Sequence, residues 1–184
     1  MRNKLPLYLT LSRIVLTAPI MLLMMDNTAV GRITATVLFI IASITDYWDG
    51  YFARKYNAVS DLGKFMDPVA DKILVTGVLV ILLVSNQVDP WMVMLFVVRD
   101  TIVGGVRAAA AAAGVIIAAQ TTGKWKAALQ FISLPLLIMN DLQPQFKNHQ
   151  YGYWLLWLSV ILSLKSGFDY CLAYRNGLKR QSNS

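Results

Sequence analysis

The chain has 184 residues, of which 57% are hydrophobic and only 15% are charged, and its mean hydropathy is +0.53. A soluble domain carries roughly 25% charged residues, so this composition excludes an ordinary soluble enzyme, a coiled coil and a disordered tail. The net charge of +7 is typical of a membrane protein with basic cytoplasmic loops, and no nucleic-acid-binding motif accompanies it. We therefore expect an all-α, polytopic membrane protein that forms a single domain over residues 1–184.

Six stretches of the chain are candidates for membrane-spanning helices on length and hydropathy. In chain order they are Leu7–Met25, Ala29–Ala53, Asp67–Ser85, Trp91–Ala113, Trp125–Met139 and Tyr151–Tyr174. Lys and Arg gather at both termini and in the second and fourth connections, whereas the other connections are nearly free of them. The positive-inside rule then predicts that both termini are cytoplasmic.

This sidedness places the polar ends of five spans on one side of the membrane. The second, fourth and sixth spans end on the cytoplasmic side, and the third and fifth begin there. Ionisable groups within spanning helices are costly and usually functional. The sequence therefore predicts a polar cavity that opens to the cytoplasm. Aromatic residues near the span ends are typical interface anchors; they are Trp91, Trp125, Tyr151, Tyr153 and Trp154.

The end of the second span combines acidic residues with small ones. Asp46 and Asp49 are three residues apart and share a helix face, and Gly50 and Ala53 continue that face. The acidic face is thus also the face without bulky side chains. This pattern predicts room for a ligand beside the two carboxylates.

The start of the third span adds a second acidic pair. Asp67 and Asp71 are four residues apart and share a face of that helix. Four carboxylates between two antiparallel helices repel one another where the dielectric constant is low, and divalent cations remove that repulsion. An all-oxygen site suits Mg²⁺ or Mn²⁺ better than zinc, and two such ions about 3.5–4 Å apart form a clamp for phosphoryl transfer. A plainer interpretation is that Asp67, directly before Pro68, caps a helix.

The spacing D-x2-D-G-x2-A-R-x8-G-x3-D-x3-D resembles the signature of the CDP-alcohol phosphotransferase family. Its eight positions are filled here by Asp46, Asp49, Gly50, Ala53, Arg54, Gly63, Asp67 and Asp71. The six-span architecture is also that of the family, so the resemblance covers nearly the whole chain. Members of this family transfer the phosphatidyl group of a CDP-linked lipid to an alcohol and release CMP.

The resemblance implies a role for each matching position. Two divalent cations, Mg²⁺ or Mn²⁺, are expected on Asp46, Asp49, Asp67 and Asp71, and Asp71 is also the expected general base. The resemblance further implies a set of contacts to the CDP-lipid, formed by Thr10, Gly50, Ala53, Arg54, Ser60 and Gly63. It also implies direct in-line attack, without a covalent enzyme intermediate, and a homodimer.

Further motifs resemble the phosphatidylglycerophosphate synthase branch of the family, whose acceptor is sn-glycerol 3-phosphate. They are Leu5–Arg13, Asp67–Lys72, Arg99-Asp100 with Arg107, and Gly123–Gln130. A phosphorylated acceptor needs cations beside the metal site. The candidates are Arg107, Lys124, Lys126 and Arg175.

Plainer interpretations of these charges remain open. Lys124 and Lys126 could serve only to set the topology, and Arg99 and Asp100 are as readily interpreted as a structural ion pair. The chain also departs from the pattern of the branch, because Asp100 stands where a Glu is expected. Other departures are Leu7 in the first motif and Ala127 in the last, and none of the three belongs to the predicted metal cage.

The sequence thus predicts an integral plasma- or inner-membrane enzyme surrounded by membrane lipids, with its active site facing the cytoplasm. Its expected substrates are CDP-diacylglycerol and sn-glycerol 3-phosphate. The same chemistry with another acceptor (inositol phosphate, serine or phosphatidylglycerol) is the first alternative. A transporter and a catalytically inactive scaffold are others. A transporter needs charges along an opposite exit path, where Arg32 is nearly alone, and its site usually lies at the midplane.

Overall fold

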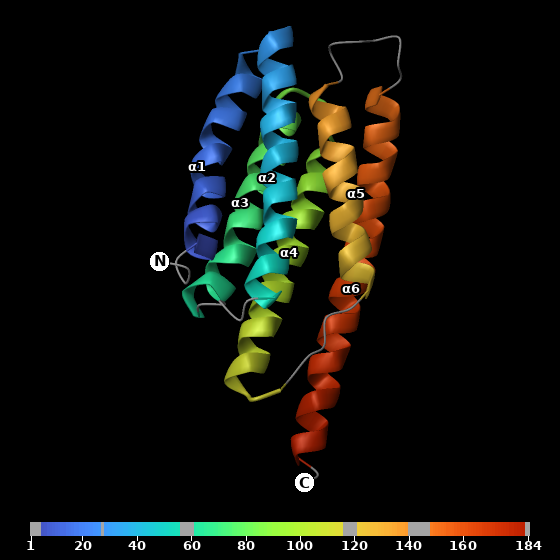
Figure 1. Ribbon diagram of the computed structural model, residues 1–184. Helices are drawn as coiled ribbons and strands as arrows, with labels where there is room; N and C mark the ends of the chain where they lie inside the picture. The colour runs from blue at the N-terminus through green and yellow to red at the C-terminus, as the bar shows by residue number, and fades with distance from the viewer. Residues whose placement is uncertain (1–4, 27, 56–60, 116–120, 140–147, 183–184) are drawn as a thin grey trace.

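The protein is a bundle of six helices (Figure 1). The computed structural model describes the backbone of residues 5–26, 28–55, 61–115, 121–139 and 148–182, and the side chains of 12–26, 28–45, 69–115, 122–139 and 149–179. The helices are α1 (Leu5–Met25), α2 (Ala29–Lys55), α3 (Asp61–Val84), α4 (Pro90–Ala112), α5 (Thr121–Ile138) and α6 (Asn148–Ser182). No strand occurs in these ranges, so the all-α expectation is confirmed for the described chain.

Successive helices run up and down the bundle, so that its two ends differ in what they gather (Figure 1). The first helix starts and the last helix ends at the lower end of the view, where α2 also gives way to α3 and α4 to α5. The helix ends that adjoin the basic segments of the sequence therefore share one end of the bundle. The upper end holds the three connections that carry few Lys or Arg residues.

A single buried apolar cluster draws on all six helices. It includes Ile20 of α1, Phe39 of α2, Leu82 of α3, Met92 of α4 and Leu134 of α5, and it continues to α6 through Leu156 and Val160. The helices pack as α1 on α2 and α3, α4 on α3 and α6, and α5 on α2, α3 and α6. Close packing of these side chains holds the helices against one another.

Two helices differ from the lengths expected from hydropathy. Helix α3 begins at Asp61, six residues before the apolar stretch starts. Asp67 lies inside the helix, so the interpretation of Asp67 as a helix cap is wrong. Helix α6 has 35 residues and continues past Tyr174 to Ser182. Its polar last turns extend beyond the other helices in Figure 1. Because these turns are not apolar, hydropathy alone could not detect them.

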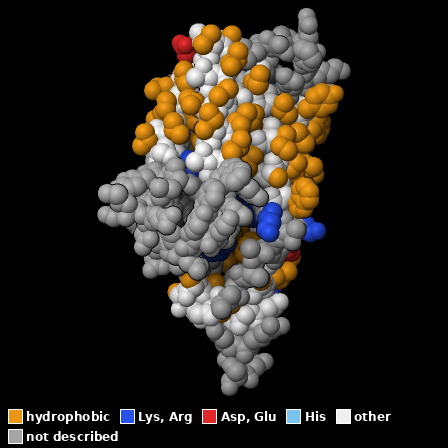
Figure 2. Space-filling model, in the orientation of Figure 1, with side chains coloured by type: hydrophobic (Ala, Val, Ile, Leu, Met, Phe, Trp, Pro, Cys, Tyr) orange, Lys and Arg blue, Asp and Glu red, His pale blue; other side chains and the backbone are white. Residues whose placement is uncertain are grey.

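Apolar side chains also cover much of the outer surface. Large exposed ones occur on every helix, such as Val15, Ile41, Val84, Ile132 and Phe168. Figure 2 shows them spread over the upper part of the visible face, with Lys and Arg side chains at the lower border of this apolar zone. Within the described residues, His149–Lys179 is the one stretch that passes a strict test of length and hydropathy for crossing a membrane.

The upper end of the bundle is closed by a cluster that we call the upper cluster: Arg32, Gln87, His149 and the carbonyls of Leu137 and Ile138. Arg32 is 4% exposed and lies 3.4 Å from the Ile138 carbonyl, to which its Nη1 donates. With its amide oriented to suit its neighbours, Gln87 donates to the Leu137 carbonyl at 2.6 Å and accepts from Arg32 at 2.9 Å. A cation here meets the unsatisfied carbonyls at the C-terminus of α5.

Candidate active site at the lower end of the bundle

The backbone brings the two acidic segments to the same end of the molecule. Asp46 and Asp49 lie in the last ten residues of α2, and Asp67 and Asp71 in the first eleven of α3. Both segments lie toward the lower end of the bundle in Figure 1. The side chains of Asp46, Asp49 and Asp67 lie outside the described residues, while Asp71 is partly buried. Among the described side chains no group of three potential metal ligands occurs, so the four-carboxylate cage stays a prediction.

The side chains expected to contact the CDP-lipid also lie outside the described residues. Ser60 lies outside the described residues altogether, and the others lie in described helical backbone without described side chains: Thr10, Gly50, Ala53, Arg54 and Gly63. Their contacts stay predictions.

The described part of the site is a set of charged side chains that we call the Asp100 network: Lys72, Arg99, Asp100 and Lys126. The Oδ1 atom of Asp100 accepts a hydrogen bond from Arg99 Nη1 at 2.7 Å and another from Lys126 Nζ at 2.7 Å. The main-chain carbonyl of Asp100 accepts from Lys72 Nζ at 2.9 Å. Residues of α3, α4 and α5 therefore meet at Asp100.

The network is partly buried between the helices, and Lys126 is its buried member. Lys126 is 8% exposed, its ammonium lies 5.5 Å from the centre of the Phe96 ring, and it interacts electrostatically with Asp71. Arg99 is held from α6 as well, because its Nε donates to the Ser163 carbonyl at 2.8 Å. Charged groups in such surroundings interact more strongly than they do in water.

Two glycines make room for these long side chains. A Cβ atom added to Gly104 would lie 3.1 Å from the Lys72 Nζ, and one added to Gly167 would lie 3.3 Å from the Arg99 Cγ. Both distances are shorter than ordinary van der Waals contact. Hence the small residue on α4 lets Lys72 reach Asp100, and the small residue on α6 lets Arg99 pack against that helix.

Several buried polar atoms around the network have no hydrogen-bond partner among the described residues. They are the hydroxyls of Ser163, Ser166 and Thr122 and the Nε2 of Gln130. Ser166 is fully buried. Its Oγ would lie 3.6 Å from a Cβ atom added to Gly123, and Gly123 precedes Lys126 by three residues on α5. Buried polar groups are normally paired, so these side chains are available to bind a polar ligand or water.

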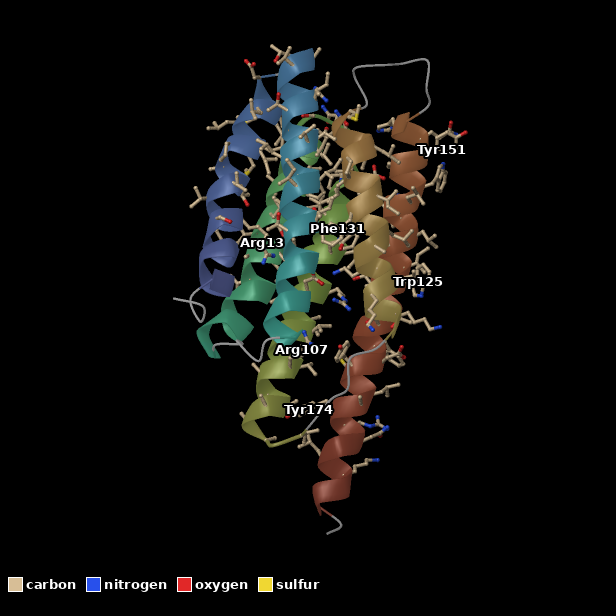
Figure 3. All side chains as sticks on the ribbon, viewed as in Figure 1. Arg13, Arg107, Trp125, Phe131, Tyr151 and Tyr174 are labelled. Atoms are coloured by element: carbon tan, nitrogen blue, oxygen red, sulfur yellow. The ribbon has the colours of Figure 1, made fainter. Side chains whose placement is uncertain are left out.

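The four predicted acceptor-binding cations do not form one cluster. Lys126 belongs to the Asp100 network. Arg107 is exposed and stacks on Tyr170 of α6, with its guanidinium carbon 5.5 Å from the ring centre (Figure 3). Lys124 and Arg175 are exposed, and neither forms an ion pair or a hydrogen bond with the described residues. The structure thus singles out Lys126 as the buried member of the set.

A further buried cation, Arg13, belongs to the first helix (Figure 3). It is 2% exposed and lies on α1, which packs against α2 and α3. Thr17 and Met21 of α1 lie against Gly77 of α3. Because α1 and α3 run in the same direction in Figure 1 with the same rise per residue, Arg13 is about level with Asp71. Positive charge thus lies near the acidic segments from this side too.

An open apolar groove of about 390 Å³ leads away from this level along α1 and α3. Its lining includes Val69 and Lys72 at the lower end and Met21, Thr76 and Val80 further up. From Val69 to Val80 the helix rises about 16 Å. The groove therefore joins the charged region to the apolar outer surface.

The sequence interpretation did not bring Lys72, Arg99 and Asp100 together with Lys126. Their signal was present, because an adjacent Arg-Asp pair inside an apolar span is costly. The sequence pattern does not show which residues of other helices Asp100 contacts. Contacts from Asp100 to Lys126 and Lys72 cross 26 and 28 positions of the chain, and helical periodicity cannot show them.

Comparisons with known proteins agree with the motif. A model of the CDP-alcohol phosphatidyltransferase family matches residues 3–165. The chain is 35% identical over 178 residues to the CDP-diacylglycerol–glycerol-3-phosphate 3-phosphatidyltransferase of Bacillus subtilis (strain 168), covering 90% of this chain and 92% of that protein. It is 37% identical over 172 residues to the protein of the same name from Rickettsia bellii (strain RML369-C), covering 91% and 93%. An Arabidopsis thaliana relative, named as the 3-phosphatidyltransferase 2, is 34% identical over 176 residues, covering 88% and 76%.

A family match over most of the chain and relatives of this similarity settle the class. The chain belongs to the CDP-alcohol phosphatidyltransferase family and is an enzyme of that type. The resemblance inferred from the eight motif positions is therefore confirmed.

Proposed function

We propose that this chain transfers the phosphatidyl group of CDP-diacylglycerol to sn-glycerol 3-phosphate, with release of CMP, in phospholipid biosynthesis. The relatives from Bacillus and Rickettsia carry both substrates in their names and align over nine-tenths of the chain. The observation that carries the choice of acceptor is the partly buried Asp100 network, in which two cations contact the Asp100 carboxylate and a third contacts its main-chain carbonyl. Lys126 of this network lies within electrostatic reach of Asp71. Three cations gathered at one aspartate are suited to a phosphate.

The proposed metal site is the set of Asp46, Asp49, Asp67 and Asp71, which would hold two Mg²⁺ or Mn²⁺ ions. The family generally uses divalent metals, and the donor set fits, because it consists of hard carboxylate oxygens on two consecutive helices whose acidic segments lie at one end of the bundle. When bound, the ions would neutralise the diphosphate of the lipid and stabilise the departing CMP.

Other steps of the proposed reaction are assigned to individual side chains. Asp71 accepts the proton from the attacking hydroxyl of glycerol 3-phosphate. Lys126 holds the phosphate of that acceptor, and Arg107 approaches it from the α4–α6 side. The CDP group is bound by residues at the end of α2, the start of α3 and the start of α1: Thr10, Gly50, Ala53, Arg54, Ser60 and Gly63. Positioning both reactants on a rigid bundle lowers the entropic part of the barrier.

We infer that all six helices span a plasma or inner membrane, with both termini and the site on the cytoplasmic side. The shortest, α5, has 18 residues and is about 27 Å long, close to the roughly 30 Å of a hydrocarbon core. Exposed aromatic side chains lie near the upper end, at Trp91, Tyr151 and Trp154, and Trp125 lies on α5 nearer the lower end (Figure 3). Such belts mark the two interfaces of a membrane.

The apolar groove on α1 and α3 suits an acyl chain of the lipid substrate. The resemblance to the family also implies a homodimer.

An acceptor panel tests this function. Purified protein is mixed with CDP-diacylglycerol, Mg²⁺ or Mn²⁺, and one acceptor at a time, and CMP release is measured. We expect release with glycerol 3-phosphate and none after chelation of divalent ions. Release with serine, inositol phosphate or phosphatidylglycerol but not with glycerol 3-phosphate would establish the first alternative instead.

The transporter alternative needs charges along an opposite exit path, where Arg32 is nearly alone. Arg32, which stood nearly alone on the opposite side, contacts the last carbonyls of α5 and Gln87. It is a structural partner of a helix end and not part of an exit path. The charged residues of the Asp100 network lie on other helices, near the middle of α3 and α4 and in the second turn of α5.

A further inference from the structure

Asp100 is the point at which three helices exchange charged contacts. Its side chain accepts from Lys126 of α5 and from its neighbour Arg99, and its main-chain oxygen accepts from Lys72 of α3. Lys72 directly follows Asp71, the proposed base. One residue of α4 is therefore tied both to the helix of the base and to the proposed phosphate-binding lysine.

The contacts restrict side chains that are otherwise mobile. A lysine has four rotatable bonds and loses about 2 kcal/mol of rotamer entropy when it is fixed. Asp100 fixes Lys126 before any ligand arrives, and Arg99 fixes the Asp100 carboxylate in turn. Arg99 is itself anchored to α6 through the Ser163 carbonyl at 2.8 Å. The rotamer entropy of Lys126 is thus lost when the protein folds and not when the ligand binds.

The same contacts leave donors available for a ligand. An ammonium group carries three N–H donors, and the described residues provide one acceptor for Lys126 Nζ, the Asp100 Oδ1 at 2.7 Å. Two donors are therefore not used by the described residues and can serve phosphate oxygens. The Arg99 guanidinium has five donors, of which Nε and one on Nη1 are used.

We propose that Asp100 is a positioning residue for the acceptor, which holds Lys126 at a fixed place relative to Asp71. A phosphorylated alcohol bound to Lys126 then presents its hydroxyl to the base in one orientation. This inference rests on the proposed function, and it extends it to a residue outside the motif. It assigns a role to the Arg99-Asp100 pair, for which a purely structural interpretation was equally open.

The test is a comparison of Michaelis constants in three variants. Asp100→Ala frees Lys126, and we expect the KM for glycerol 3-phosphate to rise about 10-fold or more, as for the loss of a charged hydrogen bond. The KM for CDP-diacylglycerol should stay within about twofold, the range of a neutral substitution. Asp100→Asn keeps an acceptor oxygen and should restore part of the loss. Asp89→Asn is the matched control: Asp89 accepts a hydrogen bond from Tyr153 at the upper end, so its loss should leave both constants unchanged.

A double-mutant cycle separates positioning from general damage. If Asp100 acts through Lys126, adding Asp100→Ala to Lys126→Ala should raise the KM for glycerol 3-phosphate no further. Additive effects, an equal rise in both Michaelis constants, or an unchanged or lower KM for glycerol 3-phosphate in Asp100→Ala would overturn the inference. If Asp100→Ala folds poorly, Asp100→Asn decides the test. That variant should raise the KM for glycerol 3-phosphate more than the KM for CDP-diacylglycerol.

The wild-type protein distinguishes this failure from failure of the function. If it releases CMP with glycerol 3-phosphate while Asp100→Ala behaves as wild type, only the positioning role is refuted. If it releases CMP only with an acceptor that lacks phosphate, such as serine, both the proposed function and the positioning role are refuted.

Discussion

The upper cluster and the Asp100 network both bury cations, but they satisfy them differently. Arg32 in the upper cluster meets neutral oxygens at the C-terminus of α5 and on Gln87. In the Asp100 network three cations share one residue, and buried hydroxyls nearby have no partner among the described residues. A buried cation that meets neutral oxygens at a helix end serves the fold, whereas three cations gathered at one aspartate suit an anion. The difference shows that burial of a charge alone does not mark a functional site.

The largest expected effect concerns the base beside the Asp100 network. Asp71→Asn removes the proposed proton acceptor and one metal ligand, so CMP release should fall by about 100-fold or more. The variant should remain folded, because Asp71 is only partly buried. Near-normal turnover of the purified, folded variant would exclude Asp71 from catalysis.

The next effect tests which lysine faces the acceptor. Lys126→Ala should raise the KM for glycerol 3-phosphate about 10- to 100-fold, since a buried charged contact to phosphate is lost. Lys124→Ala is its matched control, because Lys124 is exposed two residues earlier on the same helix. Steady-state kinetics that show equal effects of the two substitutions would remove the distinction between a buried and an exposed lysine.

A third variant tests the structural side of the comparison. Arg32→Ala leaves the Ile138 carbonyl and Gln87 without their partner and should lower the free energy of unfolding by about 1–3 kcal/mol. Thermal unfolding in detergent measures this loss. The Michaelis constants of the folded fraction should not change, and a selective change in the acceptor constant would place Arg32 in the functional path.

The smallest effect concerns Arg107, which is held by an aromatic ring and not by an ion pair. Tyr170→Leu removes the stacking partner of Arg107, which is worth about 0.5–1 kcal/mol at an exposed site. We expect a two- to fivefold rise in the KM for glycerol 3-phosphate. Tyr174→Leu on the same helix is a suitable control, and an equal rise there would argue against the role of the stack.

The fold was largely predictable from hydropathy, and the exceptions have physical causes. The starts of α2 at Ala29 and α4 at Pro90 agree with the apolar patterns to within one residue. Hydropathy missed the first turns of α3, which are polar, and the last turns of α6 beyond Tyr174. These segments are helical without being apolar, so a hydropathy window cannot detect them.

The family was recognisable because its motif is local in sequence. The residues from Asp46 to Asp71 resemble the family signature, and their spacing also predicts that each pair of carboxylates shares a helix face. The place of Asp100 was not predictable, since its contacts with Lys126 and Lys72 join separate helices. For the same reason the sequence could not separate Lys126, which is buried, from Lys124, which is exposed.

The most direct test of the account is the preference for a phosphorylated acceptor. Wild type and Lys126→Ala are compared by the ratio of kcat/KM for glycerol 3-phosphate to kcat/KM for glycerol, with CMP release as the signal. The account predicts a strong preference for glycerol 3-phosphate in the wild type and a ratio at least about 10-fold smaller in the variant. An unchanged ratio would contradict the claim that the Asp100 network recognises the phosphate of the acceptor.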